Sequence, residues 1–317
     1  MRTLTFEIPS DHTSTKVLHF LRGRAGLSSR LIRNLKTRPD GILCNGEPIR
    51  TIDYVYPGDL LTVNLPDDVP VVDEDLRPRR TGFHPSEPVP EPEILYEDED
   101  LVAVNKPGGL AIHQSHNHQG DTLADWMTDR YRAQGTPAVF RAIGRLDKGT
   151  SGVVVCAKNQ FAAPKLQGNV HKTYLALVLG EYEGSGTIDT PIYRPDPGKT
   201  IRACGPDGDP SVTHWESLEH GDGWSFLHIT LETGRTHQIR VHFASLGTPL
   251  AGDDMYGAPE DPDLSRQALH CVCAETVQPY TGQPLRFEAP LPEDMERALA
   301  RCRNAFAEPF GKNGVTP

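Results

Sequence analysis

The stretch "GRLDKGTSG", residues 144–152, places a single carboxylate between two cations among small, turn-forming residues. Asp147 is flanked by Arg145 and Lys148, and the apolar run "VVVCA" follows at once, as expected of a buried strand. A carboxylate held at the end of such a strand can act as a base or a nucleophile, and a nearby guanidinium favours its charged form. The simpler interpretation is a surface turn with solvated charges, so the rest of the chain must discriminate between the two.

A second candidate lies in "TGRTHQIRVHFASLG", residues 233–247. Apolar residues at 239, 243 and 246 follow the i, i+4, i+7 spacing of a helix. Thr236 can cap the start of this helix and Gly247 can end it. The spacing therefore predicts that Ile239 and Arg240 lie in the first turn, where the helix dipole favours a neighbouring anion.

Three other segments predict strands that would carry these groups. "HKTYLALVLGE" alternates, with Lys172 and Tyr174 on one face, and "EDLVAVNKPGGLAIH" is a buried strand closed by Lys106 and a Pro-Gly-Gly turn. "THWESLEHGDGWSFLHITLE" is a hairpin around a Gly-Asp-Gly turn. Strands outnumber helices and neighbouring strands are antiparallel, so the pattern favours an α+β fold over an alternating doubly wound one.

Three clusters of possible metal ligands carry less weight. "HQSHNH" brings His113, His116 and His118 together without a supporting carboxylate, which favours a solvated loop. "GDDM", residues 252–255, is interpreted as a structural turn, and the "CVC" of residues 271–273 lies in an expected strand without further ligands. We therefore expect no metal site.

The composition suits a globular protein of two domains. The chain has 317 residues, of which 37% are hydrophobic and 24% charged, and no stretch approaches the about 20 apolar residues of a membrane span. Six scattered cysteines without a CxxC pair, and an N-terminus without the apolar core of a secretory signal, favour a reduced, cytoplasmic location. The net charge of −11 argues against nucleic-acid binding only as an average.

That average conceals three parts. Residues 1–66 contain nine Lys and Arg against six Asp and Glu, whereas residues 67–92 are acidic and proline-rich and read as an extended linker. Residues 93–310 form the larger α+β domain. We expect the linker to keep residues 1–66 from packing tightly on that domain.

The N-terminal part has the pattern of two short helices followed by a small sheet. "STKVLHFLRGRAGLSSRLIRNLKT" has helical spacing interrupted at residues 23–26, and "GILCNGEPI" and "VYPGDLLTVNLP" predict strands around an Asn-Gly turn and a Pro-Gly turn. The phrases "NGEPI" and "PGDLLTV" resemble the small α/β RNA-binding domain named after ribosomal small-subunit protein four. The resemblance implies that six cations near the interruption meet RNA phosphates, namely Arg22, Arg24, Arg30, Arg33, Lys36 and Arg38.

The larger domain resembles the RluA family of RNA pseudouridine synthases in several ordered blocks. "GRLDKGTSGVVVCAKN" is similar to the family signature His-Arg-Leu-Asp, two variable positions, Thr-Ser-Gly, an apolar run and Ala-Lys. "YEDEDLVAVNKPGGLAIH", "HKTYLALVLGE" and "LETGRTHQIRVHFASLGTPLAGDDMYG" are similar to its other motifs, and "ALHCVCAETVQPYTGQPLRFEAPLP" to its C-terminal end. The similarity covers residues 93–292. It implies the pseudouridine synthase fold, with a mixed, largely antiparallel central sheet and flanking helices.

The resemblance also implies a reaction and the residues that perform it. Such an enzyme breaks the uridine N1–C1′ bond and rejoins the base through C5, an isomerisation that needs no metal or cofactor. The implied catalytic residues are Asp147, paired with Arg240, and Tyr174, which presents its ring to the flipped uracil. Arg145 would fill the space that the flipped base leaves, Ile239 would wall the base, and Lys106 and Lys172 are expected as further substrate contacts.

Two departures from the signature keep other interpretations open. The usual histidine is Gly144 here and an acidic residue is replaced by Gly149, although neither position holds the nucleophile. The alternatives are a non-catalytic RNA-binding or ribosome-assembly factor and a pseudouridine synthase for transfer RNA. A carboxylate glycoside hydrolase would need a second acid, which the motifs do not supply. We expect a monomer that acts on large-subunit ribosomal RNA or a pre-ribosomal particle, without a membrane partner.

Overall fold

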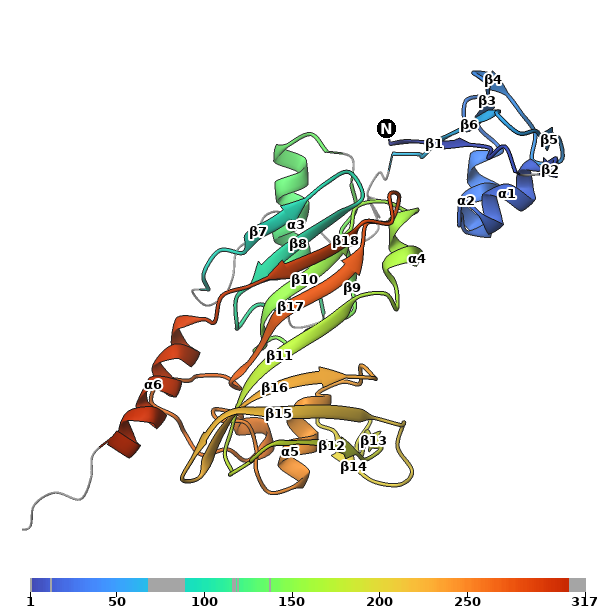
Figure 1. Ribbon diagram of the computed structural model, residues 1–317. Coiled ribbons are helices and arrows are strands. Elements are labelled where there is room, and N and C mark those ends of the chain that lie inside the picture. The colour runs from blue at the N-terminus through green and yellow to red at the C-terminus, as the bar shows by residue number, and fades with distance from the viewer. Residues whose placement is uncertain are drawn as a thin grey trace, which may run out of the picture.

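The computed structural model describes residues 2–11, 13–67, 89–115, 118, 120–136 and 138–307. Within these residues the larger domain is built on one sheet of ten strands, seen along the centre and lower part of the molecule in Figure 1. Eight strands follow the order β12-β15-β16-β11-β17-β10-β8-β7, while β18 pairs with β17 and β9 with β10. The strands are β7 (Glu93–Glu97), β8 (Leu101–Lys106), β9 (Arg141–Ile143), β10 (Ser151–Ala157), β11 (His171–Val178), β12 (Ser185–Asp189), β15 (Val212–Gly221), β16 (Trp224–Leu231), β17 (Leu269–Val277) and β18 (Pro284–Glu288).

The sheet is mixed and largely antiparallel, which confirms the predicted α+β class. Of its pairings among the described residues, only that of β10 with β17 is parallel, with Ser151 opposite His270 and Gly152 opposite Cys271. The helices of this domain are α3 (Leu123–Ala133), α4 (Ala162–Leu166), α5 (Gln238–Ser245), α6 (Glu293–Ala307) and the short 3₁₀ turn η1 (Asp254–Tyr256). A separate ribbon pairs β13 (Ile192–Tyr193) with β14 (Ala203–Cys204).

Strand β10 lies at the centre of the hydrophobic core. Each of its seven residues is buried, because the run "VVVCA" packs on both faces and α3 covers one of them with Leu123, Met127 and Tyr131. A strand with both faces covered requires a continuous apolar run, which is the feature that predicted it. The predicted strands at 101–104 and 171–181 and the hairpin that ends near residue 232 are confirmed by β8, β11 and the pair β15–β16.

The N-terminal part forms its own small α/β unit. Helices α1 (Val17–Gly23) and α2 (Ser29–Leu35) pack on a sheet of order β1-β6-β3-β4, and a short ribbon pairs β2 with β5. Ser28 caps α2 by accepting a hydrogen bond from the backbone N–H of Leu31 at 3.2 Å. The strands of this part are β1 (Thr3–Glu7), β2 (Thr15–Lys16), β3 (Ile42–Cys44), β4 (Glu47–Pro48), β5 (Tyr54–Val55) and β6 (Leu60–Asn64). No helix in the described part of the chain is long and apolar enough to cross a membrane.

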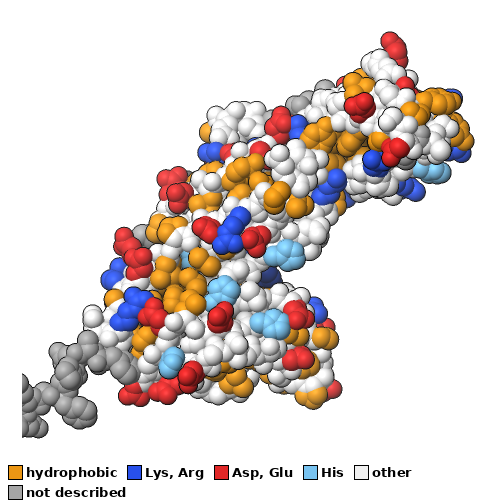
Figure 2. All heavy atoms as spheres, viewed as in Figure 1, with side chains coloured by type: hydrophobic (Ala, Val, Ile, Leu, Met, Phe, Trp, Pro, Cys, Tyr) orange, Lys and Arg blue, Asp and Glu red, His pale blue; other side chains and the backbone are white. Residues whose placement is uncertain are grey.

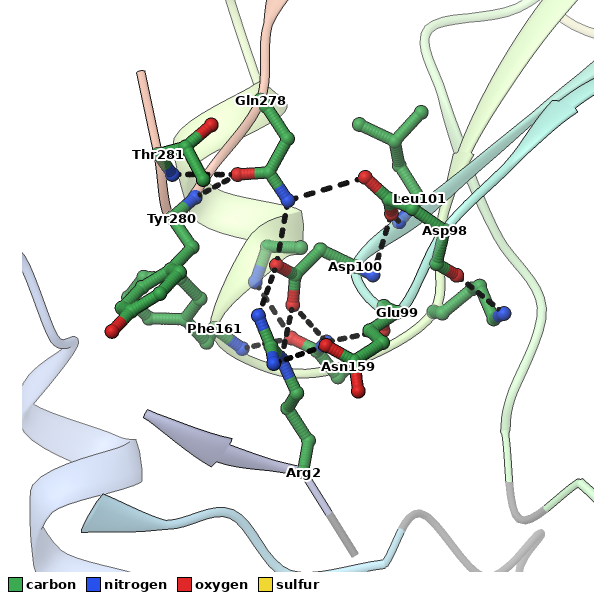
Figure 3. Close-up of polar contacts among 12 residues, drawn as sticks. Arg2, Asp98, Glu99, Asp100, Leu101, Asn159, Phe161, Gln278, Tyr280 and Thr281 are labelled. Carbon is green, nitrogen blue, oxygen red and sulfur yellow. Dashed lines mark hydrogen bonds and ion pairs between the residues drawn. The ribbon is translucent and has the colours of Figure 1, made fainter. Parts of the chain in front are cut away.

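The two parts meet in a polar network that Figure 3 shows in detail. Its centre is Asp100, whose side chain is fully buried. Arg2 of the N-terminal part donates to Asp100 Oδ2 at 3.1 Å and pairs with Glu99. Asn159 and Gln278 each donate an amide N–H to Asp100 at 2.8 Å, so the acid is satisfied from three segments of the chain.

Apolar contacts accompany this network and correct one expectation. Phe161 belongs to the larger domain, yet it is 1% exposed and completes the hydrophobic cluster of the N-terminal part. Tyr280 packs on the same cluster and exchanges hydrogen bonds with the backbone of Thr5. The prediction that the linker holds the two parts apart is therefore wrong for the described residues. The composition of a linker shows that it is extended, but it does not show whether the two parts that it joins have surfaces that pack together. Residues 68–88 of that linker lie outside the described residues.

Candidate active site

A cavity of about 550 Å³ opens where the loop 144–150 faces the start of β11 and the first turn of α5. Six of the seven residues that we predicted as catalytic or substrate-binding line it, namely Arg145, Asp147, Lys172, Tyr174, Ile239 and Arg240. These residues come from three separate segments of the sequence, so their convergence in one cavity is a property of the fold.

The loop that carries Asp147 is held in place by two cations that bind its backbone carbonyls, Lys106 and Arg266. The backbone N–H of Thr150 bonds to the carbonyl of Asp147 at 3.1 Å and closes the turn. Lys106 donates to the carbonyl of Lys148 at 3.1 Å, and Arg266 donates to the carbonyl of Gly149 at 2.9 Å. Because these bonds fix three backbone groups in a row, the carboxylate is presented on a rigid support.

The prediction that Lys106 contacts substrate is wrong. Its side chain is fully buried and lies outside the cavity lining. Besides the carbonyl of Lys148, its ammonium binds those of Pro107 at 2.9 Å and Leu110 at 2.8 Å. Burial lowers the pKa of Lys106 to about 7, with Arg266 acting in the same direction and Asp147 against it. Lys106 thus supports the catalytic loop from within the protein.

Arg240 links Asp147 to a second acid that the sequence analysis had treated as part of a turn. Its Nη1 lies 3.3 Å from Asp147 Oδ2, while its Nε and Nη2 each lie 2.7 Å from the carboxylate of Asp253. Arg240 therefore uses its bidentate fork to bind Asp253, and the expected pairing with Asp147 is a single contact. Burial alone would lower the pKa of Arg240, but the hydrogen-bonded Asp253 outweighs it and raises the value.

Asp253 can reach this position because the preceding residue is a glycine. Gly252 has a φ of +70°, and a Cβ there would lie 2.3 Å from the carbonyl oxygen of Arg266. Only a residue without a side chain permits that approach. The side chain of Asp253 is 1% exposed, compared with 13% for Asp147, so the two acids that share Arg240 differ in access to the cavity.

Tyr174 and Ile239 form apolar walls of the cavity, as expected. Tyr174 is 7% exposed and Ile239 is 3% exposed. Burial, helped by the charges of Cys271 and Asp147, raises the pKa of Tyr174 well above its usual value, so its hydroxyl keeps its proton. Lys172 lines the cavity beside them, and burial lowers the pKa of its ammonium.

Arg145 and Gly144, one of the two departures from the signature, line the cavity, whereas the other departure, Gly149, lies outside its lining. Arg145 donates to the hydroxyl of Thr236 at 3.1 Å across the cavity mouth. Gly144 has a φ of +73°, which a side-chain-bearing residue rarely adopts, and a Cβ at Gly149 would approach Gln267 Oε1 to 2.3 Å. In this chain both glycines therefore fit their local backbone.

The start of α5 differs from the prediction. Thr236 does not cap the helix, because its hydroxyl accepts from Arg145 and the N-cap position falls on His237. His237 has a φ of +57° and lines the cavity, with its Nε2 3.9 Å from Asp147 Oδ2. Sequence reasoning missed both His237 and Tyr256, which bonds to it at 3.0 Å. Gly247 follows the end of the helix as predicted.

Within the described residues, no three His, Cys, Asp or Glu side chains converge as a metal site would require. His118 pairs with Asp121 at 2.7 Å, and burial lowers the pKa of His113. His116 lies outside the described residues. The acid pair of the "GDDM" turn is divided, since Asp253 binds Arg240 and Asp254 is exposed.

Comparison with known proteins shows which family and which proteins this chain is similar to. The family described as RNA pseudouridylate synthase matches residues 100–245. An uncharacterized RNA pseudouridine synthase of Bacillus subtilis, YjbO, is 37% identical over 87% of this chain and 96% of its own length. The ribosomal large subunit pseudouridine synthase D of Nitrosomonas europaea is 42% identical over 70% of this chain and 68% of its own. Among solved structures, human RNA pseudouridylate synthase domain containing 1 is 29% identical, with a TM-score of 0.53 over 68% of this chain and 97% of that one.

Proposed function

The chain belongs to the RNA pseudouridylate synthase family and is an RNA pseudouridine synthase, and on that premise we propose that Asp147 is its catalytic carboxylate and that large-subunit ribosomal RNA is its substrate. The observation that carries the first part is geometric. Asp147 is the acid that combines a rigid backbone support, a guanidinium at 3.3 Å and access to the cavity.

The cavity suits a uridine that has left its stack. A volume of about 550 Å³ accommodates a nucleoside, and the walls formed by Tyr174 and Ile239 suit the two faces of uracil. Asp147 would lie beside the ribose, where the glycosidic bond breaks at N1 and re-forms at C5. When the base rejoins the ribose through C5, the C5 proton leaves and N1 takes up a proton, so the change is an isomerisation. The Tyr174 hydroxyl keeps its own proton and can hydrogen-bond to the base during this exchange. Arg145 at the mouth can occupy the space that the flipped base vacates.

The N-terminal part supports binding to a large, structured RNA. Arg22, Arg24, Arg30, Arg33 and Lys36 are exposed, and no ion pair is found for them within the part of the chain that the structure describes. Arg38 is partly buried and lies 3.6 Å from Asp40. Figure 2 shows Lys and Arg side chains gathered over the end of the molecule that α1 and α2 form. Exposed, unpaired cations gain affinity by releasing counterions from phosphate.

The choice of ribosomal RNA is supported by relatives that carry this name. The proteins of Nitrosomonas europaea and Xanthomonas campestris, 42% and 37% identical, are named ribosomal large subunit pseudouridine synthase D. We further propose a cytoplasmic monomer, in agreement with six cysteines that are all free thiols.

The test is direct mapping. Purified protein is incubated with 23S-type ribosomal RNA, assembled large-subunit particles and total transfer RNA, and new pseudouridines are located by chemical labelling and sequencing. We expect site-specific modification of the large-subunit RNA. Modification of transfer RNA alone would overturn the substrate assignment. Full activity of Asp147→Asn on any of these RNAs would overturn the catalytic one.

A further inference from the structure

A chain of hydrogen bonds runs toward Asp147 and ends 3.9 Å from its carboxylate. The backbone N–H of Arg202 donates to the hydroxyl oxygen of Tyr256 at 2.9 Å. The same hydroxyl lies 3.0 Å from Nδ1 of His237, and Nε2 of that ring lies 3.9 Å from Asp147 Oδ2. The reaction described above assigns no task to His237 or Tyr256, although the side chain of His237 is only 8% exposed.

The direction of this chain favours the tautomer of His237 that carries its hydrogen on Nε2. Tyr256 already accepts from Arg202, so its single proton is free to be donated to Nδ1. Burial raises the pKa of Tyr256, which keeps that proton in place. A neutral imidazole that accepts at Nδ1 carries its hydrogen on Nε2. The remaining N–H donor of His237 therefore faces Asp147 and the cavity.

The contacts of Asp147 are divided unequally between its two oxygens. Arg240 Nη1 approaches Oδ2 at 3.3 Å, and the closest carboxylate atom to His237 Nε2 is again Oδ2. Within the described residues, Oδ1 has no hydrogen-bond partner, although the side chain opens onto the cavity. The arrangement leaves Oδ1 as the oxygen that meets the substrate.

The backbone at His237 is unusual in a way that fits this task. Its φ of +57° and ψ of +19° lie in the left-handed region, where a residue other than Gly, Asn or Asp is held at a cost of about 1–3 kcal/mol by the surrounding structure. Such residues concentrate at functional sites. Here the conformation starts α5 and directs the ring to the cavity lining.

We propose that His237 is a positioning residue that donates its Nε2–H to Asp147 Oδ2 when substrate fills the cavity, with Tyr256 setting the required tautomer, so that Oδ1 alone is left to react. This inference rests on the proposed role of Asp147. A movement of roughly 1 Å brings Nε2 from 3.9 Å to ordinary hydrogen-bond distance of about 2.9 Å. The bond then restrains rotation of the carboxylate together with Arg240.

The charges around the ring agree with a neutral donor. Burial lowers the pKa of His237, Asp147 raises it, and three arginines, Arg240, Arg202 and Arg145, lower it further. The ring is therefore neutral at the pH of an ordinary assay, and its role as a donor depends on the tautomer and not on a positive charge.

Two substitutions at this position separate the role of Nε2 from that of the fold. His237→Gln can place an amide N–H near the position of Nε2. His237→Asn reaches only the position of Nδ1, but tolerates the left-handed backbone better. We expect kcat of His237→Gln to stay within about threefold of wild type, and kcat of His237→Asn to fall about 10- to 100-fold with little change in KM, the range of a lost hydrogen bond to a charged group. The thermal midpoint of His237→Asn should be no lower than that of His237→Gln.

A purely structural His237 predicts the reverse order, with His237→Asn the more active of the two, and that result would overturn the proposal. The assay uses full-length protein and a short, unpaired uridine-containing RNA, so that binding by the N-terminal part does not limit turnover. Full activity of Asp147→Asn in the same assay would refute the proposed role of Asp147 on which this inference rests, whereas an unaffected His237→Asn beside an inactive Asp147→Asn refutes only this inference.

A double-mutant cycle tests the role of Tyr256. Tyr256→Phe removes the donor to Nδ1 but retains the ring beneath Arg240, whose guanidinium carbon lies 5.1 Å from the ring centre. We expect Tyr256→Phe to lower kcat about 5- to 10-fold in the wild-type background and less than twofold in the His237→Gln background, because the tautomer then no longer matters. Equal losses in the two backgrounds would show that Tyr256 acts by another route and would overturn the chain of bonds.

Discussion

Cations serve this protein in two opposite ways, one around the loop and the cavity of Asp147 and one on the N-terminal part. Lys106, Arg240 and Arg266 are buried or nearly so, and each is tied to fixed partners by two or more hydrogen bonds. The cations in and beside α1 and α2 are different: Arg22, Arg24, Arg30, Arg33 and Lys36 are exposed and unpaired among the described residues. Arg38, which is partly buried, lies 3.6 Å from Asp40.

The difference separates positioning from attraction. A buried cation with fixed partners has lost its freedom, so it defines where a neighbouring group lies and its removal leaves an uncompensated charge or carbonyl. An exposed cation interacts weakly with any single partner but contributes to the field that draws phosphate to the surface. The chain carries −11 overall, so on our proposal the attraction for phosphate is local, and the N-terminal part, with a net charge of +3, is the part that would provide it.

The largest expected effect is at the acid that the buried cations serve. Asp147→Asn should lower turnover at least about a thousandfold, because the amide can neither attack nor remove a proton, while RNA affinity and thermal midpoint change little. Single-turnover formation of pseudouridine measures the loss, and a filter-binding titration provides the control. A residual rate of one tenth of wild type would exclude Asp147 as the essential group. Since the reaction is an isomerisation, EDTA should leave wild-type activity unchanged.

The next effect concerns the acid that holds Arg240. Asp253→Asn leaves a buried guanidinium without its bidentate partner and should reduce the free energy of unfolding by about 4 kcal/mol, with loss of activity. The matched control is Asp254→Asn, at the exposed neighbouring acid, which should change stability by less than about 0.5 kcal/mol. Urea unfolding of both variants makes the comparison. Similar stabilities would mean that Arg240 is solvated when its partner is removed.

A smaller effect is a pH dependence at Lys106. Its pKa in the folded protein, about 7, lies below the value of 10.5 for a free lysine. Between these values the unfolded chain binds a proton that the folded chain does not, so stability contributed by this residue rises with pH and is lost as pH falls toward 7. We therefore expect the unfolding free energy of wild type, relative to that of Lys106→Met, to increase by about 3 kcal/mol from pH 7 to pH 10. A difference independent of pH would show that Lys106 stays charged throughout.

The smallest expected effect per substituted residue is on RNA affinity, when exposed cations of the N-terminal part are removed. Removing two of them in the double variant Arg30→Gln, Arg33→Gln should lower the slope of log K against log salt by about 1.4–1.8, with unchanged kcat on a short unpaired RNA. Arg50→Gln is the control on the same surface, since that cation is 76% exposed but already paired with Asp53 at 2.9 Å. A change in kcat with an unaltered salt slope would place α2 in the catalytic cavity and not in the electrostatic field.

The features that depend on neighbours along the chain, such as strands and helices, could be predicted from the sequence. The features that depend on how deeply a side chain is buried could not. The buried strand β10, the alternating strand β11 and the helical turn that carries Ile239 and Arg240 follow from local periodicity. The choice of Asp147, Tyr174 and Arg240 as site residues came from the resemblance to the RluA family. Lys106 was misassigned because the end of a strand does not reveal which side of the loop its side chain enters.

Asp253 was missed for a related reason. Its role is set by the competition of two acids for one guanidinium. Burial decides that competition in favour of Asp253, which is 1% exposed, over Asp147, which is 13% exposed. Nothing in the letters "GDDM" distinguishes the buried acid from the exposed one beside it.

The parallel pairing of β10 with β17 has a consequence for how the enzyme folds during its synthesis on the ribosome. Strand β10, which follows the loop of Asp147, pairs with β17, which lies about 120 residues later in the sequence. Arg266, which binds the carbonyl of Gly149, is itself held by Asp294 in α6. At a synthesis rate of about 5–20 residues per second, the ribosome needs roughly 7–30 s to pass from residue 152 to residue 294. During that interval the nascent chain already contains Asp147 but not the clamp that holds its loop. A chain terminated before α6 would therefore contain Asp147, Tyr174 and Arg240 but lack the acid that holds Arg266 against the carbonyl of Gly149.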